Sequence, residues 1–325
     1  MRKNVQKLGQ LRELNLLMIL AVLIIILVVT SPYFASWNNI KVVLGSMSTD
    51  GIVVIGMTLS LISRGIDLSV GSVMCLSMTV TALLFLAGVN PWIAAIIALI
   101  VCASLGGAIG FLVTKIKLSH FIVSLCFMGI ARGIVYALST GTPISLVTAL
   151  DRAPAFRFLG QGQIGGAVPM VVVIFIVIAI AMDIYVRKSS TVRLIFYTGN
   201  NDKAAAYSGI NVNKVTTLTC VVCSVFAGIA GIIYVNKFSG VPLTAGMGLE
   251  MTAIASAVIG GVSFNGGKGS ILGALLGLAL MAFVQNAMTL FNVQAFWQDL
   301  FRYMIVLGAV VLDGVQQNIA RKRVA

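Results

Sequence analysis

Apolar stretches of about 20 residues, each long enough for one helix to cross a hydrocarbon core of about 30 Å, recur along the whole chain. The composition agrees, because 59% of the 325 residues are hydrophobic, 10% are charged and the mean hydropathy is +1.06. The strands of a transmembrane barrel would alternate apolar and polar residues, and these stretches do not. The sequence therefore predicts an all-α, polytopic membrane protein.

The apolar pattern predicts about ten transmembrane helices within a single transmembrane domain that covers residues 1–325. The first stretch has the position of a signal peptide, but its apolar run is too long and no A-x-A cleavage site follows, so we expect it to be retained. Two longer segments, 139–166 and 187–214, interrupt the pattern and predict loops. The expected spans are 14–30, 42–62, 70–87, 92–114, 121–138, 167–185, 215–235, 250–264, 270–291 and 297–315.

The lysine and arginine residues predict the orientation. With the N-terminus inside, sixteen of the 22 lie on the inner side and four on the outer side, which is the bias of cytoplasmic segments. We therefore expect cytoplasmic N- and C-termini, a cytoplasmic segment 187–214 and an extracytoplasmic segment 139–166. The net charge of +13 is also compatible with a nucleic-acid binder, but the basic residues lie in short runs between apolar spans, so we expect a lipid bilayer and no nucleic acid as partner.

The segment 187–214 carries the signals of a short cytoplasmic helix. Asn200, Asn201 or Asp202 can cap its start, and a run of three alanines favours helix. Gly209 suits a left-handed cap at its end. The alternative interpretation is an ordinary connecting loop.

The octet GIDLSVGS, which begins at Gly65, places polar and flexible residues inside an apolar region. Gly65 and Gly71 allow close helix approach or non-helical turns, and Ser69 and Ser72 can satisfy freed backbone groups or cap the next helix. Non-helical backbone at membrane depth is tolerated only where it is buried in protein or lines a water-filled path. The octet, with Asp67 inside it, is thus a candidate gate or a packing joint.

Charged residues in the membrane are functional candidates, because each costs about 2.5 to 3.5 kcal/mol at the bilayer centre. Arg64 and Asp67 are three residues apart and are expected to pair across the octet, as are Asp299 and Arg302 on the last span. Arg132 has no such neighbour in the sequence, so we expect it to face a cavity or a partner helix.

A faint internal repeat links two parts of the chain. Asp50, an apolar run and GIDLSVGS resemble Glu250, a similar run and NGGKGS, which begins at Asn265. Both stretches begin with an acid at an outer end and finish in a Gly/Ser break near the inner side. Related roles and chance similarity among glycine-rich helices both explain the likeness.

The residues that catalysis would need are scarce. His120 is the only histidine and the five cysteines all lie in apolar segments, so we expect no metal, no disulfide framework and no bound cofactor. The segment GVSFNGGKGS at 261–270 departs from a phosphate-binding loop, because its lysine is displaced and followed by Gly269. The chain is therefore expected not to be an enzyme, and any ATP hydrolysis must come from a partner chain.

Four stretches, taken together, resemble the permease subunits of bacterial ABC importers for monosaccharides. They are FASWNNIKVVLGSMSTDGIVVIGMTLSLISRGIDLSVGSVMCLS at 34–77, GNNDKAAAYSGINVNKV at 199–215, GLEMTAIASAVIGGVSFNGGKGSILGALLG at 248–277 and VVLDG at 310–314. The resemblance implies a multi-pass protein of the bacterial cytoplasmic membrane that translocates a monosaccharide or a related small polyol or furanose. It also implies three partners: a second permease chain, identical or paralogous; an ABC ATPase subunit, which uses the ATP; and an extracytoplasmic sugar-binding protein.

The site candidates form two sets, since the resemblance implies a coupling element, and the octet and its repeat supply the candidates for a pathway or gate. The element that docks into the ATPase comprises Asn200, Asn201, Asp202, Lys203, Ala204, Ala205, Ala206, Ser208 and Gly209. The candidates for the translocation pathway or gate are Gly65, Asp67, Ser69, Gly71, Ser72, Glu250 and Asn265. No catalytic and no metal-binding residue is expected.

The chain departs from the family pattern in two places. Arg64 stands where the family usually has glycine, which bears on the local backbone geometry, and Val192 and Arg193 stand where phenylalanine and glycine are expected, which bears on the start of the coupling element. Two other function classes compete with the importer. A secondary transporter or channel would need more intramembrane acids or histidines for an ion relay, and an intramembrane enzyme would need an acid, base and nucleophile set.

Overall fold

Helices make up nearly all of the regular structure in the computed structural model, which describes residues 2–322. Among the basic residues used to predict the orientation, Arg323 lies outside the described residues. The helices are α1 (Arg2–Thr30), α2 (Trp37–Ile62), α3 (Val70–Leu86), α4 (Pro91–Lys115), α5 (His120–Ser139), α6 (Val147–Asp151), α7 (Pro154–Gln161), α8 (Met170–Lys188), α9 (Ser190–Asn200), α10 (Asp202–Tyr207), α11 (Val212–Phe238), α12 (Leu249–Ile259), α13 (Ile271–Leu290) and α14 (Ala295–Lys322). Four strands of two residues each complete the list: β1 (Ile144–Ser145), β2 (Gln163–Ile164), β3 (Val168–Pro169) and β4 (Gly240–Val241).

The predicted spans coincide with helices, with differences at the ends. Seven helices of the described chain are long and apolar enough to cross a membrane, namely α1, α2, α4, α5, α8, α11 and α13, whereas α3 and α12 are shorter apolar helices. The predicted span 250–264 is wrong at its end, because α12 stops at Ile259. Gly260 and Gly261 follow it, and Gly261 has a φ of 93°, a conformation that ends a helix.

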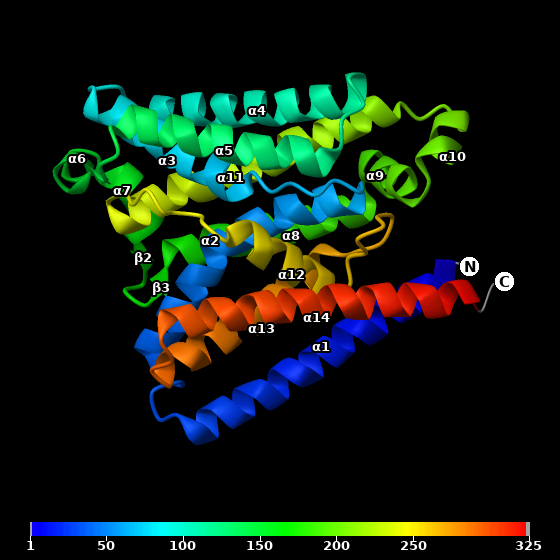
Figure 1. The fold of residues 1–325 in the computed structure, drawn as a ribbon. Coiled ribbons are helices and arrows are strands. Elements are labelled where there is room, and N and C mark those ends of the chain that lie inside the picture. Colours follow the sequence, from blue (N-terminus) through cyan, green and yellow to red (C-terminus); the bar gives the residue numbers. More distant parts are fainter. Residues whose placement is uncertain (1, 323–325) are drawn as a thin grey trace.

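The two ends of the molecule carry different elements. In Figure 1, α1 begins and α14 ends at the same end as α9 and α10, while α6, α7, β2 and β3 lie at the opposite end. The helix α11 runs through the middle and contacts α2, α3 and α4. This arrangement separates the segment 187–214 from the segment 139–166 by the length of the bundle, as the alternation of loops predicts.

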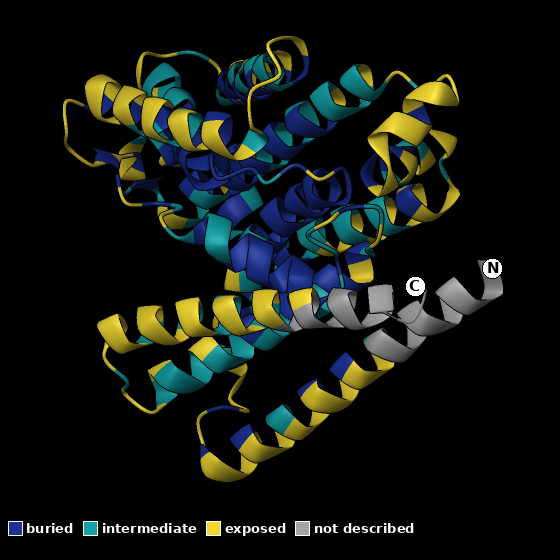
Figure 2. Ribbon diagram, turned by 45° about the vertical axis from the view of Figure 1, so that its right-hand side comes forward, coloured by how far each residue is buried: buried dark blue, intermediate teal, exposed yellow. Residues whose placement is uncertain are grey.

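Burial divides the helices into an inner and an outer group, as Figure 2 shows. Of the 18-residue apolar stretch of each helix, 72% is buried in α2 and 61% in α11, whereas only 17% is buried in α1 and in α8. The outward faces of α1 and α8 are apolar all the same, with side chains such as Ile25 and Val177 exposed. A bilayer is the medium that accepts such faces, so the outer group is the lipid-facing one.

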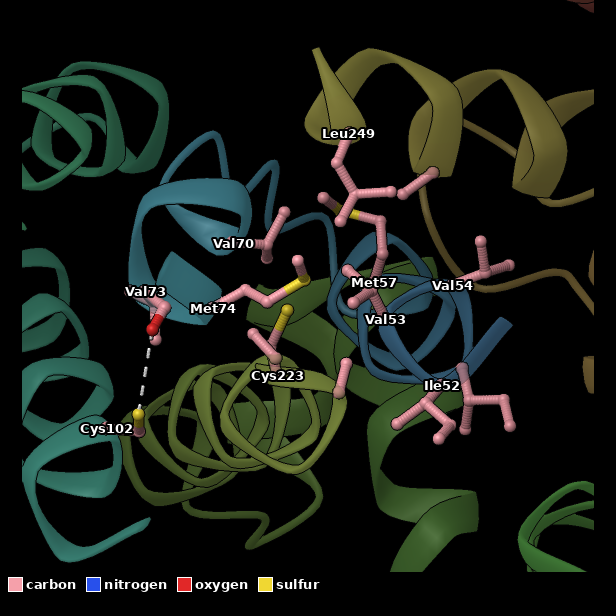
Figure 3. Packing of buried hydrophobic residues seen from close by; sticks show 14 of the residues in the cluster. Ile52, Val53, Val54, Met57, Val70, Val73, Met74, Cys102, Cys223 and Leu249 are labelled. Atoms are coloured by element: carbon pink, nitrogen blue, oxygen red, sulfur yellow. Dashed lines mark hydrogen bonds between the residues drawn. The ribbon is translucent and has the colours of Figure 1, made fainter. Parts of the chain in front are cut away.

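The inner group packs through aliphatic and sulfur-containing side chains. Figure 3 shows Met57 of α2, Met74 of α3, Cys223 of α11 and Leu249 of α12 meeting in one cluster. Cys102 belongs to the same cluster, and its sulfur lies 3.9 Å from the carbonyl oxygen of Val73. Four of the five cysteines are buried, all five are free, and within the described chain no group of three or more His, Cys, Asp or Glu side chains could hold a metal ion.

The helices α4 and α11 meet through small residues. A Cβ atom at Gly106 would lie 2.6 Å from the carbonyl oxygen of Cys220, and one at Gly110 would lie 2.7 Å from the Cα of Thr217. One turn further along, the hydroxyl oxygens of Thr114 and Thr217 are 3.4 Å apart. Small residues four apart let two membrane helices approach backbone to backbone, and this contact fixes α11 in the centre of the bundle.

The segment 139–166, predicted as a loop, is more regular than expected. It contains β1, α6, α7 and β2; β1 pairs antiparallel with β4, with Ile144 opposite Val241, and β2 pairs with β3. Phe156 anchors this segment, because its ring is buried and packs edge-on against Phe85 and Trp92. The ring centroids are 6.2 Å apart for Phe85 and 5.3 Å apart for Trp92. The hydropathy pattern did not predict these short elements, because they contain glycine, proline and polar residues and none of the elements is a long apolar run.

Neighbouring glycines of α4 provide a test of the α4–α11 contact. Gly106→Ala is expected to destabilise the chain by about 1 to 3 kcal/mol, because its new methyl group would overlap the backbone of α11. Gly107→Ala is the matched control, since its Cβ would lie 3.9 Å from Val221, an ordinary contact, and alanine gains up to about 1 kcal/mol in helix propensity. The thermal midpoint of the detergent-purified chain should fall for the first variant and hold or rise for the second. Equal midpoints would contradict the close packing.

Candidate functional site

The octet GIDLSVGS forms the non-helical break between α2 and α3. Gly65 packs against the start of α5, because a Cβ atom there would lie 2.9 Å from Nε2 of His120. On α5, His120 and Ser124 both contact the carbonyl oxygen of Ile66, at 2.7 Å from Nδ1 and 3.0 Å from Oγ. The lone histidine therefore holds the break in place, and its surroundings are those of a structural residue.

Asp67 organises the start of α3 from a fully buried position. Its Oδ1 accepts hydrogen bonds from the backbone N–H of Ser69 at 2.8 Å and from the Ser69 hydroxyl at 2.6 Å. Ser69 stands at the N-cap of α3, but its side chain makes no capping hydrogen bond and donates to Asp67 instead. Within the described chain, the other carboxylate oxygen, Oδ2, is buried and has no hydrogen-bond partner.

The prediction that Arg64 pairs with Asp67 is wrong. Arg64 has a φ of 69°, and its side chain leaves the octet for the segments around Asn200 and Asn265. Three-residue spacing brings side chains together only on a helix, and the chain between Arg64 and Asp67 is not helical. By contrast, Asp299 and Arg302 lie within α14 and do pair, at 3.3 Å.

The far end of the octet packs against the start of α12. A Cβ atom at Gly71 would lie 2.0 Å from the carbonyl oxygen of Gly246 and 3.1 Å from Oε2 of Glu250. Ser72 follows, buried in the first turn of α3. Two of the candidate gate residues, Gly71 and Glu250, are thus brought together although about 180 residues separate them in the chain.

Arg132 supports the same region from α5. Its guanidinium donates to the carbonyl oxygens of Leu243 and Ala245, at 2.7 and 3.0 Å, and so fixes the segment that leads into α12. The sequence predicted a cavity or a partner helix, and the partner is instead a loop more than 100 residues away. No spacing rule could have found it, because carbonyl groups occur at every residue.

The last candidate of this set, Asn265, lies in the glycine-rich segment between α12 and α13. Its carbonyl oxygen accepts a hydrogen bond from Nε of Arg64 at 2.8 Å. Two residues later, the N–H of Gly267 donates to the carbonyl oxygen of Ile62 at 2.8 Å. The two breaks that the sequence pairs as a repeat are therefore in direct contact.

The short helix expected within 187–214 is present as α10, and its caps are the predicted kind. Of the three possible N-caps, Asn201 is the one used, since its Oδ1 accepts from the N–H of Ala204 at 3.0 Å. Gly209, with a φ of 82°, follows the last turn, and the N–H of Ile210 bonds the carbonyl oxygen of Ala205 at 3.0 Å. This is the Schellman arrangement that a glycine after a helix predicts.

A second helix, α9, precedes α10 and was not expected. It contains the stretch in which Val192 and Arg193 depart from the family pattern, and it places Val192 in the interior and Arg193 in the open. Asn200, one of the expected coupling residues, ends α9 rather than beginning α10. The departure thus leaves the start of α10 well formed.

The two faces of α10 differ in solvent exposure. Ala205 is 5% exposed and points into the body of the molecule, whereas Lys203, Ala204, Ala206 and Ser208 are exposed. Tyr207 is 92% exposed, more than any other large apolar or aromatic side chain of the described residues. The sequence reasoning missed Tyr207, although an aromatic ring within a short, otherwise polar and alanine-rich helix was the available signal.

Comparison with known proteins identifies the family. A family model described as the permease component of a branched-chain amino acid transport system matches residues 39–310. The ribose import permease protein of Escherichia coli (strain K12) is 36% identical over 94% of this chain and 95% of its own length. The ribose import permease protein of Bacillus subtilis (strain 168) is 32% identical over 94% of this chain and 94% of its own length. The D-allose transport system permease protein of Escherichia coli (strain K12) is 34% identical over 91% of this chain and 89% of its own length. No solved structure matches the chain.

The chain belongs to this family of transport permeases. The matched region includes the octet, α10 and the segment between α12 and α13, so every candidate site residue lies inside it. The family expected from the sequence is confirmed, and the permease is a multi-pass membrane protein.

Substitutions at Asp67 separate its acceptor oxygen from its charge. Asp67→Ala is expected to destabilise the permease by about 1 to 3 kcal/mol, because the buried N–H and hydroxyl of Ser69 lose their acceptor. Asp67→Asn keeps an oxygen at that place and should lose much less. Thermal midpoints of the two purified variants provide the measurement. If asparagine were as damaging as alanine, the negative charge rather than the hydrogen bonds would hold the break.

Proposed function

We propose that this permease is the membrane-spanning, non-catalytic subunit of an ABC importer that carries a monosaccharide, or a related small polyol or furanose, across the bacterial cytoplasmic membrane. The observation that carries the proposal is α10, a capped helix at the end of the bundle with an exposed Tyr207, within a chain whose relatives include ribose import and D-allose transport permeases. ATP is bound and hydrolysed by a separate ATPase subunit, and this chain binds no cofactor.

The proposed topology has about ten crossings, with both termini in the cytoplasm. The shared end of α1, α14, α9 and α10 supports it, because an even number of crossings returns the chain to the side on which it began. The basic residues Lys203 and Lys214 lie at that end, in agreement with the charge bias of cytoplasmic segments. The α6–α7 segment then lies outside.

The partners follow from this orientation. The ATPase docks on the exposed face of α10, and an extracytoplasmic binding protein delivers sugar to the end that carries α6 and α7. A second permease chain, identical or paralogous, completes the membrane part. The residues Gly65, Asp67, Ser69, Gly71, Ser72, Glu250 and Asn265 belong to the joints that must rearrange when the pathway opens, since they lie where α3 and α12 begin and where the two breaks meet.

Single cysteines test the topology. In a chain whose exposed Cys126 is replaced by serine, we expect Gln163→Cys to react with a membrane-impermeant maleimide in intact spheroplasts and Ser208→Cys to react only after permeabilisation. Both positions are exposed, so a difference in labelling reports sidedness rather than burial. The reverse pattern would invert the proposed orientation.

Tyr207 tests the docking face. Tyr207→Ala is expected to weaken co-purification of the ATPase by about tenfold or more, because an exposed aromatic side chain is a typical anchor of a protein interface. Tyr33→Ala is the matched control, since Tyr33 is also an exposed tyrosine but lies between α1 and α2, at the other end of the bundle.

Uptake measurements complete the test of function. The permease, its ATPase and a binding protein, reconstituted together in proteoliposomes, should accumulate labelled sugar only when ATP and all three components are present. Ribose and D-allose are the first substrates to try, because relatives of the chain are named for them. Sugar uptake by the permease alone would overturn the proposal in favour of a secondary transporter.

A further inference from the structure

Arg64 occupies a backbone conformation that its own residue type does not favour. It is the second residue after α2, in the turn that leads into the octet, and its φ of 69° lies in the left-handed region. Glycine adopts this region freely, while a residue with a Cβ atom is strained there. A strained arginine persists only if its side chain makes contacts that hold it.

The guanidinium of Arg64 joins two separate segments of the chain. Its Nε donates to the carbonyl oxygen of Asn265 at 2.8 Å, and its NH2 nitrogen donates to the carbonyl oxygen of Asn200 at 2.8 Å. The third nitrogen lies 3.8 Å from Oδ1 of Asp202, the first residue of α10. One planar group thus contacts the break before α13 and the joint between α9 and α10 at the same time.

Around Arg64 the three segments touch through their backbones. A Cβ atom at Gly199 would lie 1.8 Å from the carbonyl oxygen of Ile62, the last residue of α2. The same carbonyl accepts the hydrogen bond of Gly267 at 2.8 Å. Because no side chain separates the end of α2, the end of α9 and the glycine-rich segment, a displacement of one must displace the others or break these contacts.

We propose that Arg64 is a positioning residue that ties α10 to both non-helical breaks, so that a movement imposed on α10 reaches α2 and α13 together. The proposal rests on the function proposed above, in which α10 receives the ATPase. The hydrogen bonds to the two carbonyl oxygens make the connection. The ion pair with Asp202 adds less, because the side chains of Arg64 and Asp202 are 43% and 59% exposed and water screens their attraction.

Three variants separate positioning from general stability. Arg64→Gly removes the side chain and relieves the backbone strain, so the chain is expected to fold and to keep its thermal midpoint. Arg64→Lys keeps the positive charge, but a single ammonium group does not reproduce the two directed hydrogen bonds. Arg187→Ala is the matched control, since Arg187 is another exposed arginine in an ion pair at the end of α8, but its partner, Asp183, lies on the same helix.

The first measurement uses the permease chain without its partners. In a chain whose exposed Cys126 is replaced by serine, spin labels at Lys203→Cys on α10 and Lys115→Cys at the end of α4, both exposed, report the distance between them in lipid nanodiscs. We expect the distance distribution to broaden in Arg64→Gly and Arg64→Lys and to stay as in the parent chain in Arg187→Ala. An unchanged distribution in Arg64→Gly would overturn the proposal, whatever the ATPase does.

The second measurement uses the complete importer in proteoliposomes. In Arg64→Gly, basal ATP hydrolysis is expected to remain, while its stimulation by the sugar-loaded binding protein and the sugar uptake fall by about tenfold. Uptake equal to the parent complex would overturn the coupling role. Failure of the parent chain itself to assemble with an ATPase would count against the proposed function instead, and the distance measurement would still decide the role of Arg64.

Discussion

The contact between α4 and α11 is the constraint on which the rest of the bundle depends. In a bilayer the lipid tails are as apolar as the side chains, so helices associate through close van der Waals contact rather than through the hydrophobic effect. Gly106 and Gly110 supply that contact on α4, and Gly231 repeats it on the α3 side of α11, where a Cβ atom would lie 2.4 Å from the carbonyl oxygen of Met74. With α11 fixed in this way, α2 and α3 have defined partners, and the break between them falls where α5 can reach it.

The break between α2 and α3 shows how irregular backbone is accommodated inside such a bundle. The N–H of Gly65 bonds the carbonyl oxygen of Ser60 at 2.8 Å, the N–H of Ser69 bonds Asp67, and the carbonyl oxygen of Ile66 is satisfied by His120 and Ser124. Protein groups therefore replace the water that such a segment otherwise needs at membrane depth. In this conformation the octet has the geometry of a packing joint, and a gate at this place requires the contacts of Gly71 with Gly246 and Glu250 to part.

The structural features that the sequence predicted correctly are those that depend on residues close together in the chain. The long apolar helices follow from the apolar runs themselves. The N-cap of α10, which the sequence narrowed to Asn200, Asn201 or Asp202, its Gly209 terminator and the Asp299–Arg302 pair follow from residues within one turn of each other. The predictions that were wrong, or could not be made, concern partners distant in the chain. Arg64 was assigned to Asp67 because the two are three residues apart, yet a left-handed turn sends its side chain to segments more than 130 residues away. Ala205 is a similar case, since an alanine run gives no sign of which methyl group faces inward.

The two repeated stretches each consist of an acid, a helix and a glycine-rich break, and they contact each other at two places. Near one end of the break, Gly71 contacts the residues that start α12, and near the other, Arg64 and Ile62 contact Asn265 and Gly267. Two contacts separated along the helix axes prevent rotation as well as sliding, so α2, α3, α12 and the start of α13 should move as one body. The helices α1 and α8, which have the least burial among the seven that are long and apolar enough to cross a membrane, have no comparable set of backbone contacts among the close glycine approaches of the described residues. While both contacts hold, relative motion within the permease is therefore expected between this body and its lipid-facing helices or a second chain. Motion within the body requires the contacts of Gly71 with Gly246 and Glu250 to part.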